Sequence, residues 1–541
     1  MLLPRSFRVI YITAACFLAV SFIFLLRYLR PHTLSRVFHF PASTLNRSKL
    51  GFWGPSVPVP LVPVAIVVLP QSGQVLVWSA DTASVFTNAT THTVSAIYDT
   101  ASGVVTSHNV SATHHNMFCP GLSLDVSGRP VITGGSTPNV TSIFDAAQNN
   151  TWIQGPTLNT GRGYHAQATL SDGRIFTIGG SWSGDFSTSK AGEVLDPIKG
   201  IWTRLPQCVV EPMYTHDKQG VFAADNHPWL FAWRNNSVFQ AGPAKSMNWY
   251  GVEGQGRHEP AGVRGKDGDA MNGNAVMYDA VAGKILTLGG AADYTESPAS
   301  QAAHVITLSD AFVNKPKVDE INPMHHARAY ANSVVLPTGN VLVTGGATWA
   351  KQWTDVNATM VPELWGHQTR KFIELARAPV PRTYHSVAIL LPDATILTGG
   401  GGLCWDTCRG KEKEINHMDL QVYYPPYLFD RDQKWAKRPS ILAVSDTRTR
   451  PGGSLQVRTS ERVEEFAMLR YGSATHGINT DQRRIRLDGI TLDRARSWHS
   501  YQVRVPDDPG VVLPGYWMLF AISDQGVPSV AETILVRAAS Q

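Results

Sequence analysis

The sequence predicts an all-β fold in which a seven-bladed β-propeller is followed by an immunoglobulin-like β-sandwich. Paired glycines recur through most of the chain, and a shorter region of alternating strands follows where that repeat stops. The composition agrees, because 46 glycines, 34 prolines and 15 tryptophans among 541 residues favour a turn-rich β protein over a helical one. Helices are therefore expected to be few.

The chain begins with an uncharged apolar stretch at residues 9–26, which has arginines on both sides. This stretch is long for the core of a signal peptide and lacks an obvious cleavage site, while its length is close to the minimum for crossing a bilayer. We therefore predict a signal anchor or a signal peptide at residues 1–30 and a polar linker at 31–50. Either alternative makes the rest of the chain extracellular or lumenal, secreted or anchored to the membrane.

Acceptor sequences for N-glycosylation agree with export. Seven asparagines each head an Asn-x-Ser/Thr triplet, namely Asn46, Asn88, Asn109, Asn139, Asn149, Asn235 and Asn357. The net charge is only +5, and Lys and Arg are scattered along the chain. Without a basic tract to follow a phosphate backbone, nucleic acid is not expected as a partner.

The repeated unit is a turn, a short apolar strand and a Gly-Gly pair. The pairs lie at Gly134-Gly135, Gly179-Gly180, Gly289-Gly290, Gly345-Gly346 and Gly399-Gly400. Their starts are 45, 110, 56 and 54 residues apart, so the interval of 110 residues holds two units. A period near 50 residues with paired glycines is typical of kelch propellers, in which each blade buries its two faces against its neighbours. A further unit fits residues 69–81, where a Ser-Gly turn leads into an apolar strand. We therefore predict seven such blades over residues 51–435.

The repeat stops near residue 436. Alternating segments at 454–458 and 516–520 are separated by turns at Pro451-Gly452-Gly453 and Gln525-Gly526. This spacing of short strands and turns is typical of a β-sandwich. Residues 436–541 are therefore predicted to form the immunoglobulin-like domain.

The five cysteines divide unevenly. Cys404 and Cys408 are close enough in sequence to form a disulfide, and Cys16 lies in the N-terminal apolar stretch. Cys119 and Cys208 have no evident partner, although a free thiol is a liability in an exported protein. Two interpretations of Cys119 stay open on this evidence: a buried inert thiol, or a thiol that other chemistry has consumed.

Tyrosine and histidine occur together at three turn-like places. Gly163-Tyr164-His165 follows a Gly-Arg turn, Tyr384-His385 precedes an apolar strand, and His476 precedes the polar stretch 479–484. Their spacing alone matches no metal-binding motif.

Four longer strings give these residues a context. They are His-Asn-Met-Phe-Cys-Pro-Gly at 115–121, Phe-Thr-Ile-Gly-Gly-Ser-Trp-Ser-Gly at 176–184, Gly-Gly-Gly-Gly-Leu-Cys at 399–404 and Asn-Thr-Asp-Gln-Arg-Arg at 479–484. In these strings, and from about residue 52 to the C-terminus, the chain closely resembles galactose oxidase and the other copper radical oxidases. The seven-bladed propeller and C-terminal sandwich of that family agree with the repeat.

The resemblance implies a site for one copper ion. Tyr164, His385 and His476 would bind it in one plane, with water or substrate in the fourth position, and Tyr384 would be the long axial ligand. His476 would come from a loop of the C-terminal domain that enters the propeller's central channel. Imidazole and phenolate ligands with an open tetragonal position suit Cu(II).

The resemblance also implies a redox cofactor made from the protein itself. Cys119 and Tyr164 would be joined by a thioether between the sulfur and the phenol ring, with Trp182 stacked over it. Oxidation of a primary alcohol to an aldehyde needs two electrons, and the cofactor radical would supply the second one beside copper. Tyr384 would act as general base, dioxygen would leave as hydrogen peroxide, and an extracellular peroxidase is a possible further partner.

The sequence departs from galactose oxidase where that enzyme binds sugar. The propeller is expected to begin near residue 52, without the N-terminal carbohydrate-binding domain of galactose oxidase. Ala223 stands at the place of a sugar-binding Arg, and Thr295 at that of a sugar-binding Gln. Aromatic residues Phe86, Tyr330 and Trp353 fall where the family lines its pocket. A pocket that lacks two multi-donor groups should discriminate against a polyol. An oxidase of aryl or aliphatic primary alcohols is therefore expected, in preference to galactose.

Other interpretations stay open at this stage. Tyr294 and Arg328 are candidates for the pocket, with a buried structural hydrogen-bonder as the equal alternative. A galactose or carbohydrate oxidase, or a glyoxal-oxidase-like aldehyde oxidase, would share the copper and thioether residues. A non-catalytic kelch binding module is the remote alternative, and it would need neither copper nor the Cys-Tyr pair. A monomer is assumed.

Overall fold

The computed structural model describes residues 46–541 apart from 88–90, 406–414, 496–497 and 539–541, and the described residues confirm the all-β class. Helices are limited to single turns such as α2 (Arg47–Leu50) and α3 (Val221–Ala224). None of the helices in this part of the chain is long and apolar enough to cross a membrane. The predicted anchor or signal peptide, the linker up to residue 45, Cys16 and the sequon at Asn88 lie outside the described residues.

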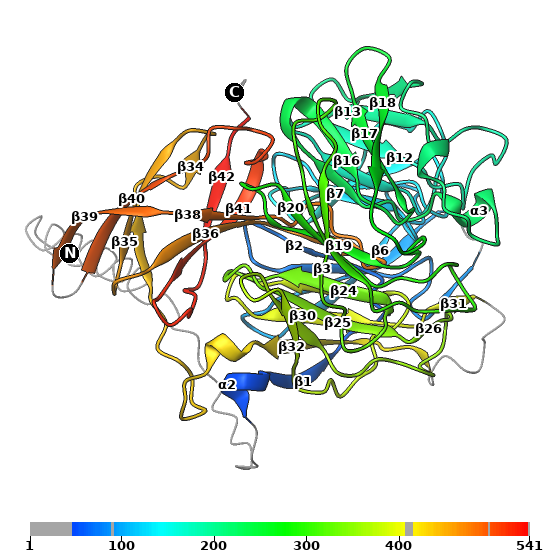
Figure 1. Ribbon diagram of the computed structural model, residues 1–541. Helices are drawn as coiled ribbons and strands as arrows, with labels where there is room; N and C mark the ends of the chain where they lie inside the picture. Colours follow the sequence, from blue (N-terminus) through cyan, green and yellow to red (C-terminus); the bar gives the residue numbers. More distant parts are fainter. Residues whose placement is uncertain (1–45, 88–90, 406–414, 496–497, 539–541) are drawn as a thin grey trace, which may run out of the picture. The chain divides into compact units, whose positions relative to one another are not determined.

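Residues 52–424 form a series of antiparallel sheets (Figure 1). Their strands are β2 (Ala65–Val68), β3 (Val75–Trp78), β5 (Thr93–Tyr98) and β6 (Val105–Val110); β7 (Gly121–Leu124), β8 (Pro130–Thr133), β9 (Thr141–Asp145) and β10 (Thr151–Gln154); β11 (Ala166–Thr169), β12 (Ile175–Ile178), β13 (Gly192–Asp196) and β14 (Ile201–Leu205); β15 (Leu230–Ala232), β16 (Ser237–Gln240), β17 (Ser246–Gly251) and β18 (Arg257–Val263); β19 (Asn274–Asp279), β20 (Lys284–Leu288), β22 (Ala303–Thr307) and β23 (Lys317–Glu320); β24 (Ala329–Val335), β25 (Val341–Ala347), β27 (Glu363–Gly366) and β28 (Lys371–Glu374); and β29 (Ser386–Leu390), β30 (Ile396–Gly400), β32 (Asp419–Tyr424) and β1 (Phe52–Pro58). Two short ladders, β4 (Val85–Phe86) with β31 (Cys404–Trp405) and β21 (Ser297–Pro298) with β26 (Trp349–Ala350), lie outside these sheets.

The first strands of most neighbouring sheets pack against each other. Strand β11 contacts β7 and β15, and β24 contacts β19 and β29, which in turn contacts β2. The last sheet joins both ends of the repeat, because β1 pairs with β32 in antiparallel register from Phe52↔Tyr424 to Pro58↔Asp419. Such pairing lets a ring of sheets bury its faces and hide its edges. The described residues supply seven sheets of this kind, and a closed ring of seven blades stays the prediction.

The paired glycines mark places where the backbone closely approaches a neighbouring strand or the segment before the next sheet. Gly345 and Gly346 both have positive φ, +67° and +85°. A Cβ on Gly345 would lie 2.3 Å from the carbonyl oxygen of Arg382, and one on Gly346 would lie 2.7 Å from that of Ala329. No L side chain fits between these strands, which explains the Gly-Gly period in the sequence.

A buried arginine recurs beside these glycines. Arg328 Nη1 donates to the Gly345 carbonyl at 2.9 Å, and its Nη2 lies 2.9 Å from the Glu363 carboxylate, with both side chains fully buried. Arg162 makes the same contacts with Gly179 and Glu193 in another sheet. Arg328 therefore belongs to a repeated structural network. Of the two alternatives open from the sequence, the buried structural hydrogen-bonder is the one the contacts support, and its guanidinium does not face the pocket.

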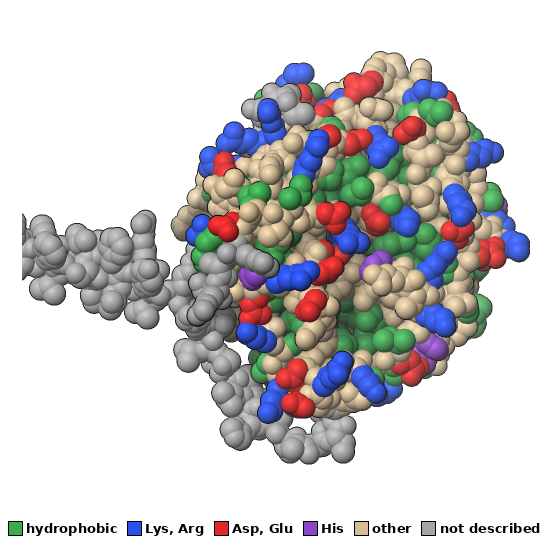
Figure 2. Space-filling view, turned by 60° about the vertical axis from the view of Figure 1, so that its left-hand side comes forward, with side chains coloured by type: hydrophobic (Ala, Val, Ile, Leu, Met, Phe, Trp, Pro, Cys, Tyr) green, Lys and Arg blue, Asp and Glu red, His purple; other side chains and the backbone are tan. Residues whose placement is uncertain are grey.

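Two further sheets form a sandwich after residue 440. One contains β33 (Ile441–Val444), β35 (Ser454–Thr459), β40 (Trp498–Arg504) and β39 (Gly489–Ala495), and the other β34 (Arg448–Thr449), β42 (Glu532–Val536), β41 (Gly515–Ile522), β36 (Glu465–Arg470) and β38 (Arg484–Leu487). Strand β37 (Ser473–Thr475) leaves this sandwich and pairs with β2 as a fifth strand, from Ala65↔Thr475 to Val67↔Ser473. On the face drawn in Figure 2, basic and acidic side chains are interspersed.

Candidate metal centre

The predicted ligands lie where strands of different sheets begin or end. Cys119 comes just before β7, Tyr164 just before β11, Tyr384 and His385 just before β29, and His476 directly after β37. Because β7, β11 and β29 line the ring and β37 lies against β2, these positions meet at one end of the ring. Residues separated by more than 350 positions in the sequence are thus brought together.

The side chains form one compact buried cluster. The ligating atoms of Cys119, His385 and His476 all lie within 4.8 Å of one another. The Cys119 sulfur is 3.6 Å from His476 Nε2, and the Tyr164 and Tyr384 hydroxyl groups hydrogen-bond each other. The Cys119 thiol also hydrogen-bonds the Tyr164 hydroxyl, an interaction that changes the pKa of both groups. This is the cluster that the resemblance implied.

Both histidines direct Nε2 into the cluster. His385 Nδ1 lies 2.7 Å from the Gly402 carbonyl, to which it must donate, and its Nε2 is buried with no hydrogen-bond partner among the described residues. His476 Nδ1 lies 2.7 Å from Thr475 Oγ1, which directs its Nε2 to Cys119. A buried orphan nitrogen is costly unless something coordinates it, and a carbonyl on Nδ1 is the usual support of a metal-binding imidazole. The donor set fits a metal ion that prefers nitrogen and phenolate oxygen.

Burial keeps these groups neutral in the absence of a cation. It lowers the pKa of His385 to about 3 and that of His476 well below its usual value. It raises the pKa of Tyr164 and of Tyr384 well above 10. A bound divalent cation would supply the positive charge that a buried phenolate lacks.

The backbone at the cluster is strained. Cys119, Tyr164, His385 and His476 all have positive φ, at 60°, 63°, 67° and 52°. A non-glycine residue in this region costs about 1–2 kcal/mol, and such residues concentrate at functional sites. Four of them in a single side-chain cluster indicate that the fold is organised around this site.

Residues 475–484, around and after His476, hydrogen-bond to several of the sheets. The side chains of this segment donate to backbone carbonyls: Thr475 to Val64, Thr480 to Gln167, Gln482 to Ser333, Arg483 to Ala232 and Arg484 to Pro337. In the other direction, the Asn274 side chain donates to the Gly477 carbonyl and the Leu124 amide to the Asp481 carboxylate. Figure 1 shows this orange segment, ending in β38, running into the ring of sheets. The Asn-Thr-Asp-Gln-Arg-Arg string is therefore the anchor that holds His476 in place.

Two residues extend the cluster. Tyr294 hydroxyl lies 3.1 Å from that of Tyr384 and 2.9 Å from His227 Nε2. The His227 ring lies nearly parallel to that of His476, with centroids 5.0 Å apart. From the sequence, Tyr294 is only a candidate for the pocket, and His227 has no predicted role. The signal that could have found His227 is its Asp-Asn-His string, at the place where the resemblance holds but the sugar-binding Arg is missing.

A cavity of about 380 Å³ opens beside the cluster. It is lined by Phe86, Tyr164, Trp182, Gln219, Phe222, Asn226, Tyr294, Gln352, Trp353, Tyr384 and Trp405. Of the predicted pocket residues, Phe86, Tyr294 and Trp353 line it. Tyr330 packs behind the wall, with its ring centroid 5.0 Å from that of Tyr384 and its hydroxyl bonded to the Tyr294 carbonyl. The Trp182 ring lies 4.6 Å from that of Tyr164 and is tilted by 52°.

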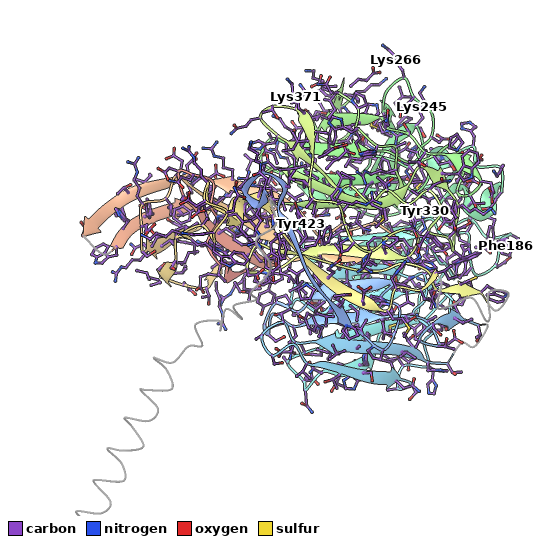
Figure 3. The ribbon with its side chains drawn as sticks, turned by 90° about the horizontal axis from the view of Figure 1, so that it is seen from below. Phe186, Lys245, Lys266, Tyr330, Lys371 and Tyr423 are labelled. Atoms are coloured by element: carbon purple, nitrogen blue, oxygen red, sulfur yellow. The ribbon has the colours of Figure 1, made fainter. Side chains whose placement is uncertain are left out.

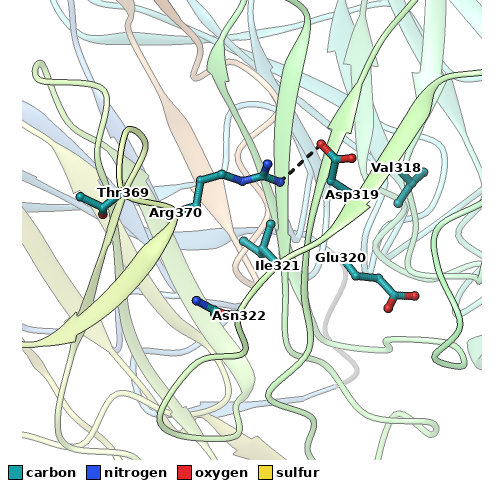
Figure 4. Close-up of a pocket in the computed structure, with 7 residues that line it drawn as sticks. All are labelled: Val318, Asp319, Glu320, Ile321, Asn322, Thr369 and Arg370. Atoms are coloured by element: carbon teal, nitrogen blue, oxygen red, sulfur yellow. Dashed lines mark hydrogen bonds and ion pairs between the residues drawn. The ribbon is translucent and has the colours of Figure 1, made fainter.

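A larger cavity of about 640 Å³ lies elsewhere and carries no comparable chemistry. It is formed by residues 318–322 with Thr369 and Arg370, and its one internal contact is the Arg370–Asp319 ion pair at 3.4 Å (Figure 4). The buried cluster is therefore the better candidate for a functional site.

The remaining cysteines fall into two groups. Cys208 is a buried free thiol beside the Gly251 carbonyl, at 3.3 Å, as the sequence left open. Cys404 is buried in β31, but Cys408 lies outside the described residues. The Cys404–Cys408 disulfide accordingly stays a prediction.

Lowering the pH from 7 to 5 is expected to destabilise the protein through His115. Burial lowers the pKa of His115 from 6.5 to about 4, where Nε2 donates to the Gly134 carbonyl at 2.8 Å. The unfolded chain takes up this proton below pH 6.5 and the folded chain does not, so stability is full above pH 6.5 and falls as the pH drops toward 4. The loss at pH 5 is about 2 kcal/mol.

Urea unfolding of copper-free protein at pH 7, 6 and 5 checks this expectation. His115→Gln should remove about 2 kcal/mol of the pH dependence, whereas His108→Gln, at an exposed position, should leave it intact. An unchanged pH dependence in His115→Gln would contradict the assignment.

Comparison with known proteins places the chain in a family. A model described as "Galactose oxidase-like, Early set domain" matches residues 438–536, and one described as "Glyoxal oxidase N-terminus" matches 252–427. A galactose oxidase of Gibberella zeae is 44% identical over 505 residues, which are 92% of this chain and 72% of that protein. The chain belongs to the galactose oxidase-like family of copper radical oxidases.

Two more relatives are an alcohol oxidase and an aldehyde oxidase. A solved structure described as a novel fungal alcohol oxidase of the AA5 family, in complex with copper, superposes with a TM-score of 0.85 at 42% identity, covering 90% of this chain and all of that one. Aldehyde oxidase GLOX1 of Arabidopsis thaliana is 26% identical over 77% of this chain and 71% of its own length. Copper is the metal bound in that fungal alcohol oxidase.

Proposed function

We propose that this copper radical oxidase converts aryl or aliphatic primary alcohols to aldehydes while reducing dioxygen to hydrogen peroxide. The observation that carries the proposal is the buried cluster of Cys119, Tyr164, Tyr384, His385 and His476, with an orphan imidazole nitrogen facing the other ligands. Tyr164, His385 and His476 would hold one copper ion, with Tyr384 as the fourth protein ligand. A non-catalytic kelch module has no use for this arrangement.

The chain's own residues divide the chemistry between them. Copper, when bound, supplies a Lewis acid for the alcohol oxygen and accepts one electron. Tyr384 takes the hydroxyl proton, and Tyr294 supports its oxygen with a hydrogen bond at 3.1 Å. A thioether between Cys119 and Tyr164 makes that phenol easier to oxidise, so its radical accepts the hydrogen atom from the alcohol carbon. The alcohol loses two hydrogens, and one dioxygen molecule receives them as peroxide.

The lining of the cavity supports an aryl or aliphatic substrate. Seven aromatic side chains besides Tyr164 line it. Its unpartnered buried polar atoms among the described residues are only Asn226 Oδ1 and Trp353 Nε1. Ala223 in α3 and Thr295 replace the two polar groups that a sugar site would use. One hydroxyl can be satisfied there, whereas several sugar hydroxyls would lose their hydrogen bonds to water without replacement.

The test is peroxide production by copper-loaded protein with a matched panel of substrates. Benzyl alcohol and 1-hexanol should exceed D-galactose in kcat/KM by at least about fivefold, since one unmet polar contact costs at least about 1 kcal/mol. Glyoxal and methylglyoxal belong in the panel because the glyoxal oxidase model matches part of the chain. Preference for an aldehyde would favour that second function, and preference for galactose would refute the substrate class.

The proposal includes export. Five of the sequon asparagines, Asn109, Asn139, Asn149, Asn235 and Asn357, are exposed and thus accessible to glycosylation. Their exposure supports a secreted protein or one anchored through its N-terminal segment. Endoglycosidase treatment of the protein from a eukaryotic host should lower its mass if these sites are used.

A further inference from the structure

An exposed aromatic pair stands at the mouth of the cavity. Phe186 is 60% exposed and Phe222 is 39% exposed, and their ring centroids lie 6.0 Å apart at an angle of 45°. Val221, next to Phe222 in α3, is 48% exposed. Figure 3 places Phe186 at the periphery of the ribbon, on the side where Tyr330 also lies. Neighbouring exposed phenylalanines in a soluble protein call for an explanation beyond packing.

The loop that carries Phe186 is held firmly. The buried Lys190 donates from Nζ to the carbonyls of Gly161, Ser183 and Asp185, at 2.6, 3.2 and 3.0 Å. The Asp185 carboxylate in turn accepts from the Ser187 amide at 2.9 Å. These three hydrogen bonds from one buried lysine to backbone carbonyls fix the conformation of residues 183–187. The fixed loop therefore holds Phe186 in its solvent-exposed position.

The pair continues the wall of the cavity. Phe222 itself lines the cavity, and Trp182, at the start of the Phe186 loop, lines it beside Tyr164. An apolar surface thus runs from the redox cluster past Trp182 and Phe222 to Phe186. Asp185, next to Phe186, is the charged neighbour in this loop, and its carboxylate accepts from the amide and the hydroxyl of Ser187. The pair itself is apolar, so a ligand that follows the aromatic wall outward meets two uncharged rings.

We propose that Phe186 and Phe222 form an outer subsite that binds the apolar tail of a primary alcohol whose CH₂OH end lies in the cavity. This inference rests on the proposed function and names the substrate more closely: an alcohol with a hydrocarbon chain or extended aryl group too long for the cavity alone. Burial of the tail against the two rings removes apolar surface from water. The favourable binding free energy therefore grows with each methylene until the tail extends beyond Phe186.

The test is a series of straight-chain primary alcohols from 1-butanol to 1-decanol. In the wild type, kcat/KM should rise by about twofold to fourfold per methylene over the longer members, through KM. Phe186→Ser should flatten this rise and cost about fivefold to tenfold with 1-decanol. It should leave 1-butanol and benzyl alcohol unchanged. Ile198→Ser removes an equally apolar side chain, 84% exposed in the β13–β14 turn of the same sheet, and should change nothing.

A second measurement separates this inference from the proposed function. Saturation-transfer NMR with copper-free protein and 1-octanol should show transfer to the terminal methyl group, and Phe186→Ser should abolish it. If the protein oxidises benzyl alcohol but Phe186→Ser leaves the chain-length series and the NMR contact intact, the outer subsite is refuted and the proposed function stands. If no alcohol yields peroxide, the proposed function fails, and the NMR contact decides on the subsite alone. A loss of self-association in Phe186→Ser, without a change in the series, would assign the pair to a contact between copies and overturn the inference.

Discussion

Cys119→Ser is expected to abolish peroxide production and to restore two hydrogens to the mass of the copper-treated protein. Serine cannot form a thioether, so Tyr164 would remain an ordinary buried phenol whose oxidation is harder. We expect kcat to fall by at least about a thousandfold, equivalent to about 4 kcal/mol of transition-state stabilisation. The measurement is intact mass after full reduction, so that the predicted Cys404–Cys408 disulfide does not contribute, together with a peroxide assay.

Cys208→Ser is the matched control. Cys208 is also a buried free thiol, with its sulfur near two backbone carbonyls that a serine hydroxyl can use. Its replacement should keep both the mass deficit and the activity. If Cys119→Ser retains activity, or if the wild type never loses two hydrogens on copper loading, the Cys119–Tyr164 cofactor does not form and the proposed chemistry must be abandoned.

The propeller-like repeat could be predicted from the sequence because short strings of neighbouring residues, the Gly-Gly pairs, encode it. The glycine pairs stand where the backbone closely approaches a carbonyl, as Gly345 does at Arg382, just before the next sheet, and Gly346 at Ala329 of the adjacent strand. The same reasoning could not place Arg328. Its partners Gly345 and Glu363 lie on other strands, and an arginine in a sequence does not reveal whether its guanidinium faces a buried carboxylate or a pocket.

The metal cluster was accessible only through the resemblance. Tyr164, Tyr384, His385 and His476 lie on two separate turns and one crossing segment, with no spacing that identifies a metal site. His227 and Tyr294 show the limit of this route. Their hydrogen bond of 2.9 Å and the parallel rings of His227 and His476 arise from packing between sheets, which no string of neighbouring residues encodes.

Tyr384→Phe is expected to lower kcat by about 10²- to 10⁴-fold while leaving the thioether and the fold intact, because general-base catalysis contributes about that much. The Tyr384 hydroxyl bonds to those of Tyr164 and Tyr294, so it is the oxygen placed to receive the alcohol proton. Intact mass should still show the two-hydrogen deficit, and copper content should be retained through His385 and His476. A larger solvent isotope effect on kcat is expected, since proton removal becomes slower.

Tyr330→Phe is the control that isolates the hydroxyl group. Tyr330 is buried, packs against Tyr384 with centroids 5.0 Å apart, and bonds through its hydroxyl to the Tyr294 carbonyl and not to the cluster hydroxyls. Its loss should cost about 1 kcal/mol of stability and little of kcat. If Tyr384→Phe keeps more than about a tenth of wild-type kcat, the loss is smaller than general-base catalysis supplies. The base would then be another group, and Tyr294, which hydrogen-bonds His227, is the next oxygen in line.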